Sequence, residues 1–421
     1  MYTNIREKLI NFSSTLLLFI PVALLTGPFL PDLFLSLICI IFIFISIKEK
    51  LSKYYLNKIF IGFVGFNIVL IISSLISNSM AFSLETSLVY FRFGIFSLAV
   101  WFLIENKRNL IKIFTIIFLI TFIFSIFNGY YQYFNGENLF GIKAILPFRL
   151  TLLFDDKMYL GGYISRLLPL LIGLIILTFK LNVRVYVFVC ILLISSDILI
   201  YITGERTALG LLFLETVFLI ILISKFKMLR ILTFLVSISI ITILSFAPLQ
   251  IKERNIDYTL EQLNINSNNG SITLFSDQHE SMIYTSLNIF YDNFLLGTGP
   301  NTFRLNCDNE NYSHNSISCA NHPHNSIVQL LSEVGIIGFA FILSISIILL
   351  ILIIRHFYFS YFKDKFVFND YQICLICCFF LTLFPFLPTQ NFFNNWINII
   401  YYLPVGFYLQ SLYSDAYLDH K

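Results

Sequence analysis

The side chains best suited to chemistry lie in residues 321–339, with the sequence NHPHNSIVQLLSEVGIIGF. His322 and His324 stand two residues apart, and after Pro323 a helix can begin at about residues 324–326. A helix N-terminus disfavours an imidazolium, so it would help to keep the His324 ring neutral and basic. A neutral imidazole accepts protons near pH 7, which predicts His324 as a general base. The alternative is a histidine that only caps the helix or packs against it.

The residues after His324 predict how this segment is held. Val328, Leu331 and Val334 recur every third residue, which is typical of one apolar face of a helix. Gly335 would end or bend this helix before a longer apolar run begins. Glu333 lies about two and a half helical turns beyond His324, and we expect it to fix the loop rather than to act on a substrate.

The elements that must position these side chains are membrane-spanning helices. The chain is 57% hydrophobic and only 12% charged, unlike soluble domains. Apolar runs of about 18–22 residues recur from end to end, which is the length that a bilayer-spanning helix needs. We predict an all-α polytopic membrane protein with about twelve spans, at about 9–27, 29–47, 57–77, 86–104, 110–134, 159–179, 183–203, 205–224, 228–247, 336–355, 372–388 and 395–412.

The positions of lysine and arginine predict the orientation. Most of the 27 basic residues fall in alternate connections, which the positive-inside rule assigns to the cytoplasm together with both chain ends. The net charge of +3 therefore reflects topology rather than nucleic-acid binding. Two outer loops are long, at about 135–158 and about 248–335. We predict a division into residues 1–247 with nine spans, a catalytic loop at 248–335 that contains short helices, and residues 336–421 with three spans and a cytoplasmic tail.

The cysteines divide into two groups. Cys307 and Cys319 lie in the large outer loop, where an oxidising exterior favours a disulfide that closes about 13 residues and contributes about 3 kcal/mol. The other five lie in apolar runs, where cysteine is usually a small core residue. Among them, Cys374 and Cys377 form a C-x-x-C, but no second ligand pair accompanies it.

Histidines gather in the same outer loop. A zinc site from His322, His324 and a third ligand is conceivable. Because no carboxylate or cysteine partner has ligand spacing, we predict no metal and no other cofactor.

Charged residues also occur where a membrane makes them costly, at about 2.5–3.5 kcal/mol near the bilayer centre. Ion pairing, for instance between Arg166 and Asp197, would explain single residues. A polar cavity open to the outer side explains the set better, because all but Glu215 fall in the outer half of the predicted topology. Arginine presents a permanent charge and a bidentate fork, so the ligand would be anionic. The set comprises Asp32, Arg92, Arg166, Asp197, Glu205, Arg206 and Glu215.

These motifs together resemble the bacterial O-antigen ligase and O-antigen polymerase superfamily. The histidine motif has His324-Asn325, then nine residues, then Gly335 and Gly338. GERTALG at 204–210 resembles the family's arginine turn and places Arg206. The block at 147–170 resembles its second outer-loop motif and places Arg149, and NFLLGTGPNTFRLNC at 293–307 resembles its G-x-G segment. The motifs cover roughly residues 147–340.

The resemblance implies a metal-independent glycosyltransferase with a GT-C-like fold, active on the periplasmic side of a bacterial inner membrane. The donor would be an oligosaccharide on undecaprenyl diphosphate. The acceptor would be another lipid-linked repeat unit for a polymerase, or lipid A core for a ligase. Membrane lipids, a flippase and a chain-length regulator would be its partners.

Details of the motifs favour the polymerase-like branch. GTGPNTFR followed by two cysteines and HPHN resembles that branch, as does GERTA. Ligases usually have an arginine in the region that reads DQHESMIY here. Either His279 or Arg304 would replace that missing charge.

The resemblance implies a role for each candidate residue. His324 would be the base, and Arg206 and Arg149 would bind the departing diphosphate, since fixed positive charge stabilises it. Arg166, Arg92 and Arg304 would be further diphosphate ligands, and His322, Asn325, Glu333 and His279 would support the site. The rival class is a transporter or flippase of lipid-linked glycans, which would also carry intramembrane arginines but often shows charges near the midplane and repeated halves.

Overall fold

The computed structural model is helical almost throughout, and it describes residues 2–144, 150–151, 159–225, 227–246, 252–262 and 276–413. No β-strand occurs among these residues, so the predicted all-α class is confirmed. The helices are α1 (Tyr2–Ala23), η1 (Leu24–Thr26), α2 (Phe29–Glu49), α3 (Ser52–Tyr55), α4 (Lys58–Leu75), α5 (Met80–Asn106), α6 (Leu110–Asn135), α7 (Leu160–Thr178), α8 (Val183–Thr203), α9 (Arg206–Leu222), α10 (Lys227–Phe246), η2 (Glu253–Asp257), α12 (Tyr258–Gln262), α13 (Asp277–Asp292), α14 (Phe303–Asn306), α15 (Ser326–Phe362), α16 (Asp370–Thr382) and α17 (Asn395–Tyr413).

A helix lies at each of the twelve predicted spans, but not every one is long and apolar enough to cross a bilayer. Within the described ranges, nine helices meet that requirement, so the chain is a polytopic membrane protein. The other three are α9, α16 and α17. Helix α9 has 17 residues and includes Arg206 and Glu215, and α16 has 13. Helix α17 reaches 19 residues but carries the polar Asn395, Asn398 and Gln410.

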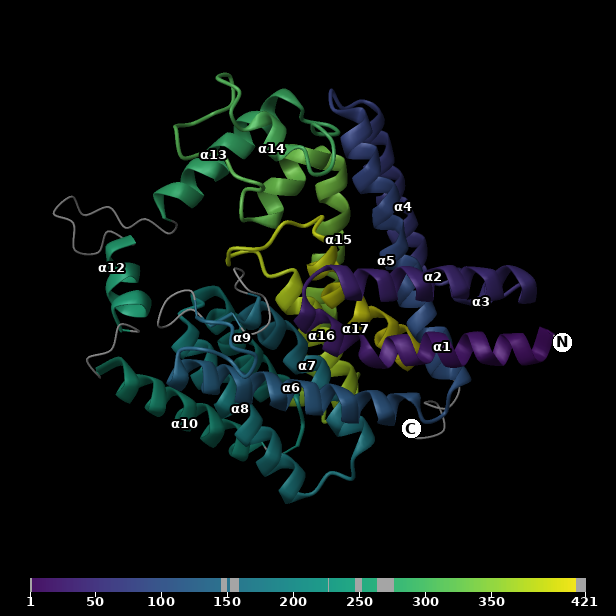
Figure 1. The fold of residues 1–421 in the computed structure, drawn as a ribbon, viewed down its shortest axis with the longest axis vertical. Coiled ribbons are helices and arrows are strands. Elements are labelled where there is room, and N and C mark those ends of the chain that lie inside the picture. Colours follow the sequence, from purple (N-terminus) through teal and green to yellow (C-terminus); the bar gives the residue numbers. More distant parts are fainter. Residues whose placement is uncertain are drawn as a thin grey trace.

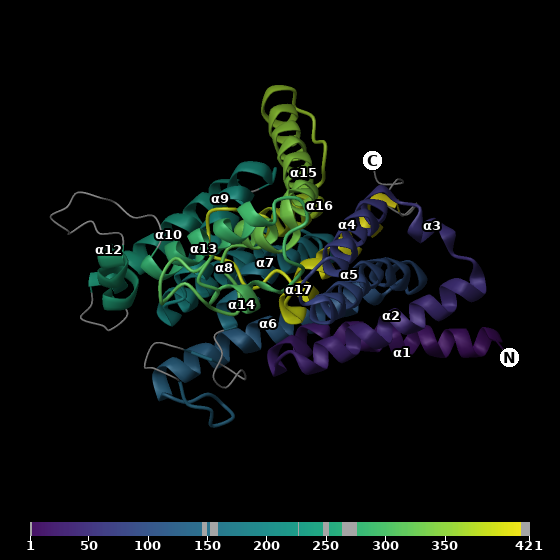
Figure 2. The ribbon, with the colours of Figure 1, turned by 90° about the horizontal axis from the view of Figure 1, so that it is seen from above.

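The helices form a buried centre and an exposed periphery. Helix α17 packs against α5, and α16 packs against α7 (Figure 1). In α7, every residue from Leu160 to Ile175 is buried. Helix α10 and the far part of α15 expose most of their apolar side chains, and α15 stands out from the other helices in Figure 2. An apolar surface of this kind is expected to face lipid.

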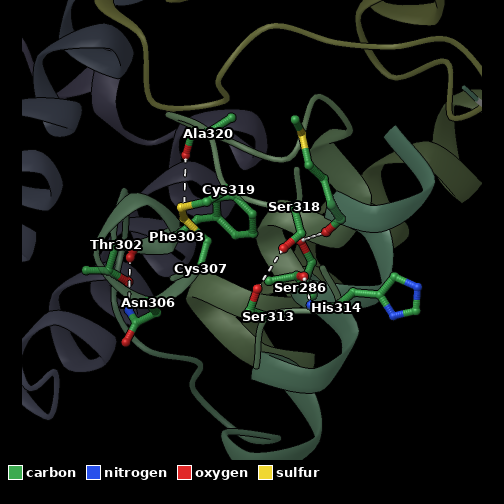
Figure 3. Close-up of a disulfide and its surroundings, with 12 residues drawn as sticks. Ser286, Thr302, Phe303, Asn306, Cys307, Ser313, His314, Ser318, Cys319 and Ala320 are labelled. Carbon is green, nitrogen blue, oxygen red and sulfur yellow. Dashed lines mark hydrogen bonds between the residues drawn. A yellow bond between two sulfur atoms is a disulfide. The ribbon is translucent and has the colours of Figure 1, made fainter. Parts of the chain in front are cut away.

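A small extramembrane unit gathers at one end of α4, where α13, α14 and the first turns of α15 lie together (Figure 1). Its apolar core is Met282, Ile289, Phe303 and Cys307. Cys307 is bonded to Cys319 in a disulfide with a Cα–Cα distance of 5.0 Å (Figure 3). The bridge ties the polar 308–318 stretch to this core.

Two glycines interlock the unit with the membrane helices. Gly335 breaks α15 with φ 69° and ψ −172°, as the sequence predicts. A Cβ at Gly335 would lie 2.4 Å from the backbone of Leu295, and one at Gly297 would lie 2.3 Å from the backbone of Glu333. Only glycine allows this approach and a positive φ without strain. The amide of Gly299 donates to the carbonyl of Glu333 at 2.8 Å, so the two segments are hydrogen-bonded backbone to backbone.

Candidate active site

Three histidines form a row at the boundary between the extramembrane unit and the membrane helices. The rings of His322 and His324 lie 4.1 Å apart, and the ring of His279 from α13 lies 5.4 Å from that of His324. All three are partly buried. We call these residues the histidine row.

His324 lies outside the helix rather than within its first turn. The helix begins at Ser326, and Asn325 is its cap, with the side-chain oxygen accepting from the amides of Ile327 and Val328. His324 has φ 52°, a left-handed conformation that is uncommon outside glycine. His324 therefore stands directly before the cap, at the N-terminal end of the helix, where the sequence predicts it.

Burial of the ring also favours the neutral form of His324. It lowers the pKa of His324, with a further lowering by His279. Burial and the neighbouring His324 lower the pKa of His322 to about 3. Both rings are therefore neutral at pH 7, and His322 is much the weaker base. The buried Nε2 of His322 has no hydrogen-bond partner in the described part of the chain.

An arginine lies at each end of the histidine row. Arg206, the first residue of α9, donates from Nη1 to Thr259 Oγ1 at 2.8 Å. It lies close enough to His279 to lower the pKa of that ring, after burial, which is the larger cause. At the other end, Arg304 of α14 acts on His322 in the same way. The row is thus a set of neutral rings between two permanent cations.

Glu333 fixes the glycine segment, and its side chain is fully buried. Its carboxylate accepts from the amides of Asn301 at 3.0 Å and Phe303 at 2.8 Å, and from Gln329 Nε2 at 3.0 Å. All of these bonds are internal to the protein. Glu333 therefore positions the segment that carries Arg304.

The loop between α16 and α17 contacts the segment that carries His324, and sequence reasoning missed this contact. The Thr389 amide donates to the His324 carbonyl at 2.8 Å, and the Thr389 hydroxyl lies 2.8 Å from that of Ser326. The Thr389 backbone also raises the pKa of His322 and so offsets part of the lowering by burial. The only signal in the sequence is the polar TQNFFNN run between two apolar stretches.

A chain of amides continues from this loop to Arg304. Gln329 donates to Asn391 Oδ1 at 2.8 Å, and Asn391 donates to Asn301 Oδ1 at 2.9 Å. Arg304 Nη2 donates to the same Asn301 oxygen at 2.9 Å. Three segments far apart in the sequence therefore hold the histidine row and its arginine in one network.

Comparison with known families identifies this region. Residues 188–343 match the family described as O-antigen ligase. The match supports a relation of this part of the chain to the O-antigen ligase and polymerase superfamily. The match contains the histidine row, Arg206 and Arg304. No similar protein was found among curated sequences.

Arg166 of α7 lies outside the matched residues 188–343 but close to the loop between α16 and α17. A Cβ at Gly162 would lie 3.6 Å from Arg166 Nη1 and 3.5 Å from Gln390 Nε2, so both groups approach the same point. Arg166 is 7% exposed, and within the described residues no hydrogen bond or ion pair to it is formed. In particular it does not pair with Asp197, which accepts from Ser237 Oγ at 2.7 Å.

Two predicted diphosphate ligands remain, Arg92 and Arg149. Arg92 pairs through both terminal nitrogens with the carboxylate of Asp32 and donates to Ser36 Oγ at 3.0 Å. None of its described contacts reaches the histidine row, so mutual pairing accounts for it better than a diphosphate does. Arg149 lies outside the described residues.

Potential metal ligands converge elsewhere. Among the described residues, the one group of three such side chains with ligand atoms close together is Cys307, Asp308 and Cys319. The two sulfur atoms there are bonded to each other. The rings of the histidine row do not form such a group.

Proposed function

We propose that this protein transfers a glycan from undecaprenyl diphosphate to the hydroxyl of another lipid-linked repeat unit, on the periplasmic side of a bacterial inner membrane. The observation that carries the proposal is the histidine row between two arginines, inside the region that matches the O-antigen ligase family. A membrane-embedded site suits a polyprenyl donor. The proposed reaction uses no cofactor.

His324 is the proposed base. Its ring takes the proton of the acceptor hydroxyl, the oxygen forms a bond to the anomeric carbon, and the bond from that carbon to the diphosphate oxygen breaks. Lowered pKa values keep both His322 and His324 unprotonated at pH 7, but the pKa of about 3 makes His322 the poorer base. His322 and His279 would instead orient His324.

The arginines receive the leaving group. The diphosphate departs with both electrons of the broken bond, and fixed guanidinium groups stabilise the developing charge without reorganising. Arg206 and Arg304 flank the histidine row and are the first candidates. Arg166 has a guanidinium that no described carboxylate neutralises, and it is the next.

A ligase is the second candidate, because the matching family is described as O-antigen ligase. The acceptor distinguishes the two. Purified protein in detergent would be given one lipid-linked oligosaccharide with either a second copy of it or lipid A core. Lengthening of the lipid-linked glycan supports the polymerase, and transfer only to lipid A core supports the ligase.

Transport is the remaining class. A transporter would move the lipid-linked glycan without changing its length. If neither acceptor were modified while the glycan crossed a vesicle membrane, the transferase would be wrong. A flippase and a chain-length regulator remain proposed partners of the transferase.

A further inference from the structure

A buried serine lies at the end of α4 that meets the extramembrane unit (Figure 1). Ser73 belongs to the last turn of α4, and its side chain is fully buried. Its hydroxyl donates toward the carbonyl oxygens of Leu296 at 2.6 Å and Glu333 at 3.1 Å. A hydroxyl has one proton, so the two carbonyls share it. Ser73 therefore contacts the segment between α13 and α14 and the first turns of α15 at once.

A second serine holds the same segment. Ser77 follows the end of α4 by two positions, and its hydroxyl donates to the carbonyl of Thr298. It also accepts from the Ser79 amide at 3.1 Å. Gly299 packs directly against this turn, because a Cβ there would lie 2.7 Å from Ser77 Oγ and 2.5 Å from Ser83 Oγ. The segment is thus attached to the end of α4 as well as to α15.

The same segment leads to Arg304 at one end of the histidine row. Asn301 follows Gly299 by two positions, and its side-chain oxygen accepts from Arg304 Nη2 at 2.9 Å. The Asn301 amide donates to the Glu333 carboxylate at 3.0 Å, and the Glu333 carbonyl is one of the two that Ser73 binds. A shift of this segment relative to α4 would therefore move the guanidinium of Arg304.

The neighbouring Ser74 makes hydrogen bonds of a different kind. It is as fully buried as Ser73. Its hydroxyl donates toward the Leu70 carbonyl at 2.8 Å and Ser87 Oγ at 2.9 Å, which lie in α4 and α5. None of its hydrogen bonds in the described part of the chain reaches the extramembrane unit. Two adjacent serines of equal burial therefore hold different parts of the protein.

We propose that Ser73 is a positioning residue of the glycan-transfer site and acts through Arg304. Its hydroxyl fixes the segment that carries Arg304 against α4, so that the guanidinium stays beside the histidine row while the diphosphate leaves. Fixed charges stabilise a developing anion because they need no reorganisation, and small displacements of them are costly. This role rests on the proposed function, because it assigns the leaving group to Arg304.

Hydrogen exchange tests the contact itself, without any substrate. The parent, Ser73→Ala and Ser74→Ala would be compared in detergent by mass spectrometry of peptides from residues 293–304. Amides in these peptides should exchange about fivefold faster in Ser73→Ala, as expected for one lost hydrogen bond, and at the parent rate in Ser74→Ala. Ser77→Ala should also raise exchange there and covers the case in which Ser73→Ala does not fold. Parent-like exchange in both Ser73→Ala and Ser77→Ala would overturn the proposal.

A double-mutant cycle tests whether the serine acts through the arginine. Rates of glycan transfer would be measured for the parent, Ser73→Ala, Arg304→Gln and the combined variant, with Ser74→Ala as the matched control. Ser73→Ala should lower kcat by about fivefold with an unchanged KM for the acceptor, but by less than about twofold in the Arg304→Gln background. Ser74→Ala should keep the parent kcat.

Two results of the cycle would overturn the proposal. One is an equal loss from Ser73→Ala in both backgrounds, and the other is an equal loss in Ser73→Ala and Ser74→Ala. A parent protein that transfers no glycan would instead contradict the proposed function, and hydrogen exchange would still decide whether Ser73 holds the segment.

Discussion

At the scale of single residues, burial favours the neutral form of all three rings in the histidine row. His324 directly precedes Asn325, the cap of α15, so it stands at the N-terminal end of that helix. Burial lowers its pKa from the usual 6.5. The proton acceptor is therefore available over a wider range of pH than an ordinary histidine would allow.

This neutrality predicts the pH profile of the reaction. A lowered pKa keeps the unprotonated form of His324 dominant as pH falls, so the midpoint of the acidic decline in kcat/KM should lie below 6.5. The measurement is initial rate against pH at low donor concentration. A midpoint at or above 6.5 on the acidic side would contradict a buried neutral base.

Arg206 should be sensitive to its shape as well as its charge. Arg206→Ala should lower kcat by about 10²–10³, the usual cost of removing one group that stabilises developing negative charge. Arg206→Lys should lose less but remain impaired, because lysine keeps the charge and loses the planar fork. Steady-state rates of both variants provide the measurement. A lysine variant as active as the parent would show that simple charge attraction is sufficient.

At the scale of elements, the break in α15 holds the site together. Gly335 and Gly297 let two backbone segments touch, and these carry Glu333 and Arg304 between them. We predict that Gly335→Ala lowers both thermal stability and activity, by several degrees and at least about tenfold, because a Cβ would meet the Leu295 backbone at a positive φ.

The matched control is Gly62→Ala. Gly62 lies within α4, and a Cβ there would meet nothing within 4 Å. This change should leave activity intact and stabilise the helix slightly. Equal melting temperatures and activities for the two variants would show that the close approach of Gly335 to the Leu295 backbone does not hold the site together.

The sequence could predict these local elements better than their contacts. The stop at Gly335 and the buried Val328 and Val334 follow from glycine chemistry and helical periodicity. The Thr389 contact with His324 could not be foreseen, because it joins segments 65 residues apart that no local pattern relates. Likewise, the bidentate pair of Arg92 with Asp32 depends on how α2 and α5 pack.

At the scale of the whole molecule, the proposed reaction requires the histidine row to face the outer side of the membrane. The basic connections predict a cytoplasmic position for the loop between α15 and α16, and hence an outer position for the extramembrane unit. A disulfide between Cys307 and Cys319 is consistent with an oxidising compartment.

Cysteine labelling tests this orientation. His314 and Lys363 are both exposed, one in the extramembrane unit and one after α15. In intact spheroplasts, His314→Cys should react with a membrane-impermeant maleimide and Lys363→Cys should not, whereas both should react after lysis. The opposite pattern would place the site in the cytoplasm.

The most direct test of the central claim is the turnover of purified protein with His324 changed. Parent protein, His324→Ala and the exposed-residue control His314→Ala would be incubated with a lipid-linked oligosaccharide and its acceptor, without nucleotide or ion gradient. Product glycan and released undecaprenyl diphosphate would be quantified together by mass spectrometry. We predict equal amounts of the two products from the parent and from His314→Ala, and neither from a folded His324→Ala. Full turnover by His324→Ala would contradict the assignment of this histidine as the base.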